Sequence, residues 1–459
     1  KVLETCAQAP RPNGALENLV KFIESSGARE TFFQLFIENE KFLELLIILF
    51  GSSDHLSQTL LRYPENIDVL LETEQTYRYK QPKEVARKLM NELKQKKTLD
   101  EKKNSLRRFK QAEELRIGLR YLTNEVDLAG TLTDLSTLAE IYLQVILETA
   151  AEATSLQFDV SQEEIKNFAI IGMGKLGGRE LNFGSDLDVV FVYQDKQGTS
   201  YRSSNASARY IWLAQTLYGL ASEQTSAGYA YKIDCDLRPE GSQAQLAIPL
   251  EGFRSYFETR AKVWEQQAIT RARFVSGDET LGQDFIKIAH DFAFKTKLKY
   301  GSIIEVARLR ERMEKELAQE FKKGKDLKKG FGGLADIEFT VQILQLMHGY
   351  QTPRLRETNT VDALKALAAA GWLDLIETEQ LQKNYFFLRN IECALRIQSR
   401  TGASRLPKKK EELDVLAKLL GYEKEDASQK LLSDYNKVTH MIRAFYSKTI
   451  DNLLRTSVS

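Results

Sequence analysis

Residues 170–193 constrain the fold of this chain more than any other stretch, because a glycine-rich turn there is followed closely by a strand-like run. The turn, at residues 172–177, has the Gly-x-Gly-x-x-Gly spacing that follows a strand in dinucleotide-binding folds. Such a fold needs a crossover of about a dozen or more residues before its next parallel strand. Only eight residues separate Gly177 from Asp186, and they are too rich in glycine and asparagine to form a helix. The spacing therefore argues against a βαβ unit.

A phosphate-binding P-loop does not fit the same turn, since Lys175 is followed by Leu176 and not by Ser or Thr. The aspartates are more informative. Asp186 and Asp188 are two residues apart on a predicted strand, so their side chains face the same side, and two like charges so close are costly unless a cation neutralises them. Mg²⁺ takes oxygen ligands and binds substrate phosphates as well. The pair predicts a magnesium-assisted phosphoryl-transfer site. The alternative is that both aspartates are solvated and the glycines only turn corners.

A second acidic pair lies on another predicted strand. Residues 229–237 alternate between apolar and polar side chains, and the polar face carries Asp234 and Asp236. If a neighbouring strand brings one of them beside the first pair, three carboxylates could bind two Mg²⁺ ions and stabilise the attacking and leaving oxygens of phosphoryl transfer. In this interpretation the glycine turn offers backbone N–H groups to a triphosphate, and Lys175 and Arg238 balance its charge.

The rest of the chain is predicted to be mainly helical. Apolar residues recur at helical spacing from about residue 16 to 152 and again from 251 onward, with strand-like runs between them. We therefore predict an α+β fold, predominantly helical, with a small mixed sheet. The expected parts are an N-terminal helical region at 1–155, an α/β domain at 156–255 and a C-terminal helical bundle at 256–459.

Several local predictions follow the apolar spacing. Residues 32–46 predict one helix with a wide buried face. Residues 337–347 and 385–397 predict two more helices, and residues 246–250 predict a strand that closes the sheet. A further helix is predicted from a stripe at steps of four or five residues, formed by Ile304, Leu309, Met313, Leu317 and Phe321.

Composition excludes several classes of protein. The chain has 65 Lys and Arg against 64 Asp and Glu, so its formal net charge of +1 provides no overall field for nucleic acid or an anionic membrane. No apolar run approaches the ~20 residues that span a bilayer. Three widely spaced cysteines support neither a disulfide framework nor a zinc site, which favours the cytoplasm. Because the chain begins with Lys1 and not Met, we expect it to be a piece of a longer protein.

The chain resembles the bacterial glutamine synthetase adenylyltransferase family, within the polymerase-β-type nucleotidyltransferase superfamily. The resemblance runs from about residue 16 nearly to the end and is specific, because several separate motifs occur in order. These motifs are Gly174-Lys175-Leu176-Gly177-Gly178-x-Glu180-Leu181, Ser185-Asp186-Leu187-Asp188, Asp234-x-x-Leu237-Arg238-Pro239, Trp264-Glu265-x-Gln267-Ala268, and Gly332-Gly333-Leu334-Ala335-Asp336-Ile337-Glu338-Phe339.

The resemblance implies a polymerase-β-like domain that uses ATP and two Mg²⁺ ions. The residues it implies are Asp186, Asp188 and Asp234 as catalytic metal ligands, with Gly174, Lys175, Gly177, Ser185 and Arg238 at the nucleotide. The implied protein substrate is glutamine synthetase, and the resemblance allows a PII-type signal protein as a second partner. Nucleic acid and membranes are not expected partners. Transfer of nucleotides to RNA ends or to small antibiotics is a weaker alternative.

The direction of the reaction stays open at the level of sequence. Enzymes of this family have two similar halves, one that adenylylates a tyrosine of glutamine synthetase and one that removes the AMP by phosphorolysis to ADP. The motif at 264–268 and the Asp336-Ile337-Glu338-Phe339 motif favour adenylylation, whereas residues 385–392 resemble the removing half. A non-catalytic half that senses a PII-type protein is a third alternative. Asp236 also stands where the family usually has arginine, which puts the balance of phosphate charge in question.

Other residues have simpler explanations. Trp264 is predicted to be a core residue between domains and not a platform for adenine. The basic residues between Lys94 and Arg108 are predicted to form a solvated helix face. Asp336 and Glu338 suit the start of a helix through capping and dipole interactions, with a place beside the site as the alternative.

Overall fold

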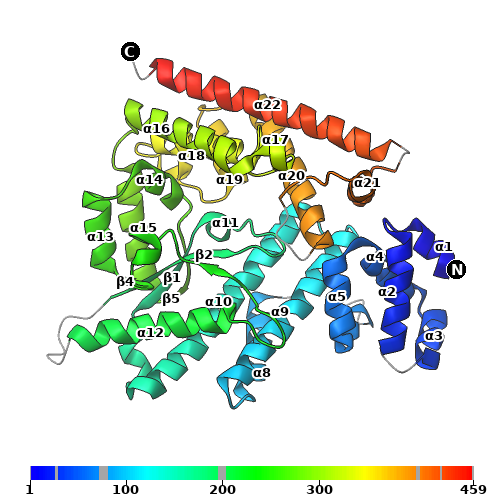
Figure 1. Ribbon diagram of the computed structural model, residues 1–459. Coiled ribbons are helices and arrows are strands. Elements are labelled where there is room, and N and C mark those ends of the chain that lie inside the picture. Colours follow the sequence, from blue (N-terminus) through cyan, green and yellow to red (C-terminus); the bar gives the residue numbers. More distant parts are fainter. Residues whose placement is uncertain are drawn as a thin grey trace.

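The computed structural model describes residues 2–25, 29–71, 81–194, 203–399, 404–423 and 426–456. Helices dominate these residues, and a single five-stranded mixed sheet lies at the centre (Figure 1). The predicted α+β fold, mainly helical with a small mixed sheet, is confirmed. Among the described helices, none combines the length and the apolar character that crossing a membrane requires.

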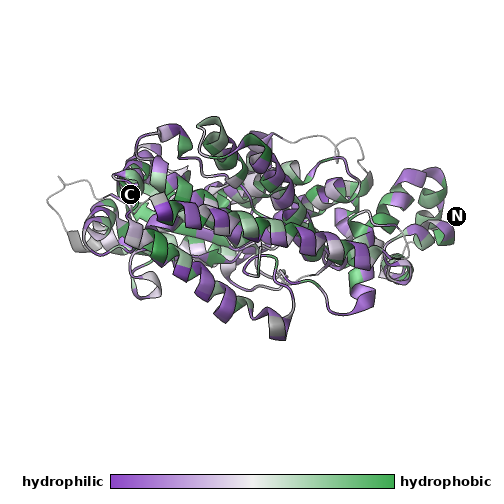
Figure 2. Cartoon of the chain, turned by 90° about the horizontal axis from the view of Figure 1, so that it is seen from above, coloured by the Kyte–Doolittle hydropathy of each residue, from purple (hydrophilic) through white to green (hydrophobic). Residues whose placement is uncertain are grey.

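The N-terminal region consists of helices that pack on one another and end against the sheet. They are α1 (Val2–Gln8), α2 (Pro12–Ser25), α3 (Arg29–Glu38), α4 (Glu40–Ser52), α5 (Asp54–Arg62), α6 (Asp68–Leu71), α8 (Pro82–Lys94), α9 (Leu99–Leu122) and α10 (Leu128–Phe158). Viewed from above, the first helices form one end of an elongated molecule, and hydrophilic and hydrophobic residues alternate along them (Figure 2). The predicted single helix at 32–46 is wrong. It is divided at Asn39, whose Oδ1 accepts the Phe42 N–H at 3.0 Å and starts α4.

The central sheet has the strand order β3-β2-β1-β5, and β4 pairs with β2. Strand β1 pairs antiparallel with β2 and β5, whereas β3 and β4 pair parallel with β2. The strands are β1 (Phe168–Gly172), β2 (Leu187–Tyr193), β3 (Ile233–Asp234), β4 (Ala247–Pro249) and β5 (Arg273–Gly277), and the helices among them are α11 (Gly174–Gly177), α12 (Ser203–Ser222), α13 (Leu250–Thr259) and α14 (Val263–Ile269).

Two predictions about this sheet need correction. The strand expected at 229–237 is only two residues long, because the Ala230 and Tyr231 N–H groups both bond to the Ala221 carbonyl and not to a strand. The predicted end of the α/β domain at residue 255 also leaves out β5, which pairs with β1 along residues 273–277. The strand predicted at 246–250 is confirmed as β4.

The sheet separates two hydrophobic cores. Because neighbouring residues of a strand face opposite sides, Phe168, Ile170 and Phe191 join the core formed with the N-terminal helices and α12. Ala169 and Val190 join a second core, formed with the helices that follow the sheet. Figure 1 shows this arrangement, with α10 and α12 on one side of the sheet and α16, α18 and α22 on the other.

The C-terminal helices cover the second face. They are α15 (Glu279–Phe294), α16 (Tyr300–Arg312), α17 (Glu320–Lys323), α18 (Leu334–His348), α19 (Thr360–Ala369), α20 (Leu375–Gln398), α21 (Lys410–Leu419) and α22 (Ala427–Thr456). The helices predicted at 337–347 and 385–397 lie within α18 and α20. The stripe from Ile304 to Phe321 is not one helix: α16 passes into a π-helical turn at Met313–Ala318, and Gln319 adopts a left-handed conformation before α17. Steps of four to five residues suit a π-helix better than a straight α-helix.

Candidate active site

Two aspartates lie side by side where β2 and β3 pair, and a third precedes β2. The parallel register places Asp188 directly opposite Asp234, and the Leu187 N–H donates to the Lys232 carbonyl at 2.8 Å. Asp186 is exposed one residue before β2. Burial, Asp234 and Asp186, in that order, raise the pKa of Asp188 to about 6. The carboxylates of Asp234 and Asp186 are therefore close enough to disfavour the ionisation of Asp188.

The glycine turn lies directly against Asp188. The Met173 N–H donates to the Asp188 carbonyl at 2.8 Å, which anchors the turn to β2. Gly174 follows with a φ of 50°, and a Cβ there would overlap Oδ2 of Asp188. Only glycine therefore lets the turn approach the carboxylate so closely. Gly177 serves packing, because a Cβ at this position would overlap the backbone carbonyl of Arg271.

The loop after β3 orients Asp234. The Asp236 N–H donates to Oδ1 of Asp234 at 2.8 Å, while the Asp236 side chain is 72% exposed. Arg238 donates to the carbonyls of Cys235, Ala244 and Gln245 at 2.7, 3.1 and 3.1 Å, and so braces this loop. A contact between Arg238 and a nucleotide stays a prediction.

The fit of magnesium can be judged from the donor set. Across the described residues, no three or more His, Cys, Asp or Glu side chains stand together as a preformed metal centre. Asp188 and Asp234 nevertheless lie on adjacent strands with negative charge that Lys328 and Arg271 offset only in part. Protein sites usually hold Mg²⁺ with one or two carboxylates, several waters and the phosphates of the substrate. The donor set fits a magnesium ion of this kind.

A cavity of about 430 Å³ opens beside the glycine turn and is called here the Gly174 cavity. Its size lies in the range of small-molecule sites. Its walls come from the turn, from β2, and from α14, α16 and α18. The lining residues include Gly174, Lys175, Asp188, Trp264, Arg271, Leu309, Met313, Lys328, Glu338 and Phe339.

Trp264 corrects one sequence-based prediction. It is not a core residue: it is 38% exposed and lines the Gly174 cavity. The basic stretch before α9 and along it needs a similar correction. Arg107 is fully buried and donates to the carbonyls of Lys103, Leu220 and Gly228 at 2.8, 3.0 and 2.8 Å, so it is not part of a solvated face.

A second cavity, of about 370 Å³, is lined partly by residues just before β2 and is called here the Asp186 cavity. Ser185 and Asp186 line it, whereas Asp188 lines the Gly174 cavity. The Ser185 hydroxyl accepts the Asn182 N–H at 3.0 Å and an Arg396 N–H at 3.1 Å. Contact between Ser185 and a nucleotide stays a prediction, and the structure places its side chain on the wall of the Asp186 cavity.

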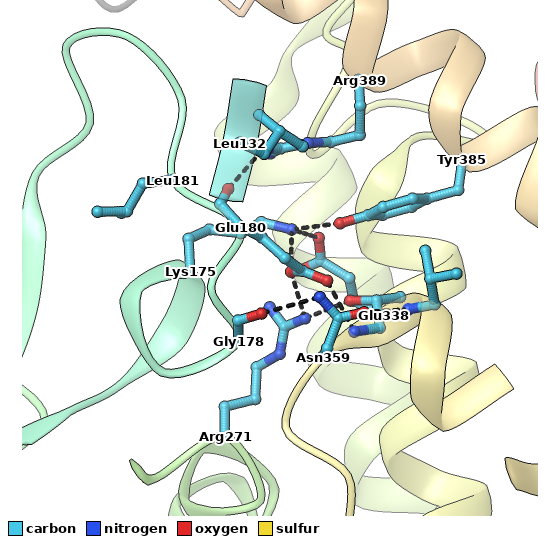
Figure 3. Close-up of polar contacts among 12 residues, drawn as sticks. Leu132, Lys175, Gly178, Glu180, Leu181, Arg271, Glu338, Asn359, Tyr385 and Arg389 are labelled. Carbon is cyan, nitrogen blue, oxygen red and sulfur yellow. Dashed lines mark hydrogen bonds and ion pairs between the residues drawn. The ribbon is translucent and has the colours of Figure 1, made fainter. Parts of the chain in front are cut away.

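Lys175 is held in a polar network between the turn and the C-terminal helices (Figure 3). Its ammonium contacts Glu338 of α18, Tyr385 Oη of α20 at 3.0 Å and Glu180 at 3.3 Å. Burial disfavours the charged form, but Glu180 and Glu338 outweigh it and raise the pKa of Lys175 above its usual range. A bond from Lys175 to phosphate stays a prediction, since its ammonium has three protein partners here.

Glu180 is the most connected residue of this network. Its carboxylate binds Arg271 at 2.7 Å and accepts the Thr360 N–H at 2.7 Å, and its backbone carbonyl accepts Arg389 at 2.5 Å. Glu180 therefore joins the segment after the turn to α19 and α20. No role was predicted for Glu180, Arg271 or Tyr385. The signals in the sequence were that Glu180 belongs to the glycine motif and that Tyr385 begins the segment that resembles the removing half.

Asp336 and Glu338 have different roles although they begin the same helix. Asp336 is fully buried and pairs with Arg310 at 2.6 Å and with Arg443 at 2.7 Å, which ties α18 to α16 and α22. Glu338 instead reaches Lys175 and lines the Gly174 cavity. The alternative of a place beside the site holds for Glu338 alone.

Comparison with known proteins gives matches along most of the chain. The family model for glutamate-ammonia ligase adenylyltransferase matches residues 43–288, and the model for GlnD PII-uridylyltransferase matches residues 304–450. Two similar proteins are both named bifunctional glutamine synthetase adenylyltransferase/adenylyl-removing enzyme. The one from Chromobacterium violaceum is 32% identical over 403 residues, which is 87% of this chain and 43% of that protein. The one from Streptomyces avermitilis is 30% identical over 452 residues, or 97% and 43%. The chain thus spans less than half the length of these relatives.

Proposed function

The chain belongs to the glutamate-ammonia ligase adenylyltransferase family, as its motifs predicted, and from this premise we propose that it transfers AMP from ATP to a tyrosine of glutamine synthetase. The observation that carries the proposal is the pairing of Asp188 with Asp234 beside the Gly174 turn, at the mouth of a cavity of nucleotide size. Neighbouring carboxylates beside a glycine turn suit metal-assisted phosphoryl transfer.

In this proposal different residues bind the metal and the phosphates. Asp186, Asp188 and Asp234 would hold Mg²⁺, which when bound compensates phosphate charge and lowers the pKa of the attacking hydroxyl. Gly174 keeps the turn close to Asp188, and the start of α11 leaves backbone N–H groups without helical partners for phosphate oxygens.

The walls of the Gly174 cavity supply a surface for the adenine and a positive charge for the phosphates. Trp264 offers an exposed aromatic face for the adenine, and Leu309 and Met313 offer apolar surface around it. Lys328 lines the same cavity and is close enough to lower the pKa of Asp188, so it would meet the negative charge of the phosphates.

The test is an exchange of Asp188 for Asn, assayed with Mg²⁺, labelled ATP and unmodified glutamine synthetase. We expect AMP transfer to fall by about a hundredfold or more, because one removed metal ligand weakens the stabilisation of transition-state charge. Asp284→Asn is the matched control, since it makes the same change at an exposed position on α15. Near-normal transfer by Asp188→Asn would contradict the proposal.

Phosphorolytic removal of AMP is the second candidate. The observation in its favour is the network of α20, where Tyr385 contacts Lys175 and Arg389 pairs with Glu392 at 2.8 Å, within the segment that resembles the removing half. Incubation of adenylylated glutamine synthetase with phosphate would release ADP if this candidate is correct. If neither transfer nor release occurs, the chain is a non-catalytic half.

We also propose that a PII-type protein regulates the enzyme, in the cytoplasm. The support is the match of residues 304–450 to a PII-uridylyltransferase model, since this segment includes the α16 and α18 walls of the Gly174 cavity. Addition of purified PII protein to the transfer assay should change the rate, and an unchanged rate at saturating PII would contradict this part.

A further inference from the structure

The two cavities use residues of one short stretch of chain for part of their walls. Asp188 faces the Gly174 cavity and Asp186, two residues earlier, lines the Asp186 cavity. In phosphoryl transfer the attacking and leaving oxygens lie roughly in line on either side of phosphorus. If the nucleotide occupies the Gly174 cavity, the Asp186 cavity, which borders the same short stretch, is open to the other reactant.

The walls of the Asp186 cavity come from parts of the chain that are far apart in sequence. They are α5 with His55 and Arg62, α9 with Lys110 and Glu114, the segment 224–232 before β3, and Arg396 of α20. The N-terminal helices therefore contribute to the cavity, although no role in the reaction was predicted for them.

The charges on these walls are unequal. Four cations and two carboxylates line the cavity, and one carboxylate, Glu114, is already paired with Lys110 at 2.7 Å. Arg396 is buried, donates to Ser185 and pairs with Glu392 at 3.2 Å. Arg62 and Lys232 remain at the exposed rim.

The contacts of the two rim cations leave their charge uncompensated. Arg62 donates to the Ser226 carbonyl, and Lys232 lies 5.7 Å from the ring centre of the exposed Tyr229. In the described residues neither of them forms an ion pair with a carboxylate. Cations without carboxylate partners at the mouth of a cavity attract an anionic segment and speed its approach.

We propose that the Asp186 cavity receives an acidic segment of the protein substrate, with its hydroxyl directed to Asp186 and its carboxylates held by Arg62 and Lys232. This inference rests on the proposed function, and it holds for either direction of AMP transfer. The Asp186 cavity would then select the protein substrate, and the Gly174 cavity would bind the nucleotide.

The experiment reverses the rim charges one at a time, in Arg62→Glu and Lys232→Glu. We expect each variant to raise KM for glutamine synthetase about tenfold and to leave KM for ATP within about twofold, because rim charges act mainly on association. Lys287→Glu, on the exposed side of α15 and beyond the sheet, is the control with the same charge change. The effect should shrink at high salt.

A second probe separates protein from nucleic acid. A copolymer of glutamate and tyrosine should inhibit modification of glutamine synthetase by the wild-type chain and should inhibit the two rim variants far less. Inhibition by a polyuridine RNA but not by the copolymer would overturn the inference. An unchanged KM for glutamine synthetase in both rim variants would also overturn it, as would a rise in KM for ATP alone.

A binding measurement tests the acceptor surface separately from the proposed function. Binding of unmodified glutamine synthetase to the chain is measured without ATP, by biolayer interferometry. If the wild-type chain transfers no AMP in either direction, the proposed function fails, but weaker binding by the rim variants than by Lys287→Glu still supports the acceptor surface. No binding by the wild-type chain, or equal binding by all variants, would contradict it.

Discussion

At the scale of single residues, position 174 tolerates substitution poorly, because both its backbone conformation and its closeness to Asp188 require glycine. Replacement by Ala would place a methyl group against Asp188 and would also strain a backbone with φ of 50°. We expect AMP transfer to fall at least tenfold, because the carboxylate has to move. Gly371→Ala is the matched control: its φ is 78°, but no atom lies within 4 Å of the added Cβ.

Both glycine variants should lose about 1 kcal/mol of stability from backbone strain alone. Urea unfolding measures this loss, and the transfer assay measures activity. Equal activity in the two variants would show that the position of Asp188 next to the turn does not matter for the reaction.

Trp264 allows a comparison of two exposed tryptophans. Trp264→Ala should raise KM for ATP about tenfold, since stacking of a base on an aromatic ring contributes about 1–3 kcal/mol. Trp372, which is 46% exposed and lies outside the Gly174 cavity, supplies the control Trp372→Ala. A similar small change in KM for ATP in both variants would argue against adenine stacking on Trp264.

The raised pKa of Asp188 predicts a dependence of stability on pH in metal-free protein. Burial, Asp234 and Asp186 raise the pKa from its ordinary 3.8 to about 6, so the folded state holds this proton where the unfolded state has lost it. This contribution to stability is complete below about pH 4 and is lost as the pH rises through 6.

Asp188→Asn should therefore be more stable than wild type at pH 7.5, by about 1–3 kcal/mol, and this advantage should widen between pH 4 and 6.5 and then level off. Urea unfolding in EDTA across this range measures it. Wild-type and variant curves that stay parallel would contradict the origin given for the shift.

The residues of the site differ in how well sequence predicts them. The closeness of Asp188 to Gly174 and Asp186 was predictable because a strand and the tight turn before it are local features of the sequence. Trp264 was misjudged, because its exposure depends on where α16 and α18 pass relative to α14. Two of the three partners of Lys175, Glu338 and Tyr385, likewise come from helices whose positions no local pattern contains.

At the scale of elements, Glu180 fixes the C-terminal helices to the turn. Glu180→Gln would leave the buried Arg271 without its carboxylate partner at 2.7 Å, and breaking such a pair costs about 3–5 kcal/mol. Glu163→Gln removes an exposed pair with Lys166 and should cost less than about 0.5 kcal/mol. Urea unfolding of the two variants measures the free energy of unfolding that each has lost. Equal losses in both variants would contradict the role assigned to Glu180.

The limits of helix prediction have physical causes here. Apolar spacing continues across Asn39, so the pattern alone hides the cap that divides α3 from α4. The stripe from Ile304 onward showed steps of five and four residues, which are compatible with a π-helical turn but do not locate it. Capping and π geometry depend on the backbone, which hydrophobic spacing describes only on average.

At the scale of the whole molecule, the sheet depends on a strand that arrives late in the chain. β5 pairs with β1 more than 100 residues downstream of β1's start, so a fragment of residues 156–255 lacks one edge of the sheet. We expect this fragment to show no cooperative unfolding by circular dichroism, because β1 would expose an unpaired edge and an uncovered apolar face. A cooperative transition comparable to that of the whole chain would contradict this expectation.

The overall order of helices, sheet and helices was predictable, because the composition changes at the borders. The pairing of β1 with β5 was not, since it joins residues that no short window contains together.

Strand β2 is the common wall of both cores, and this has a consequence for how the family diverges. Phe191 stacks with Phe168 toward the N-terminal helices, whereas Val190 and Val192 face the helices after the sheet. Alternate positions of this one strand thus pack against different sets of neighbours. Among relatives, substitutions at residue 191 should therefore covary with substitutions at residue 168. Substitutions at residues 190 and 192 should instead covary with those in the C-terminal helices, so that two sets of positions in one strand evolve independently of each other.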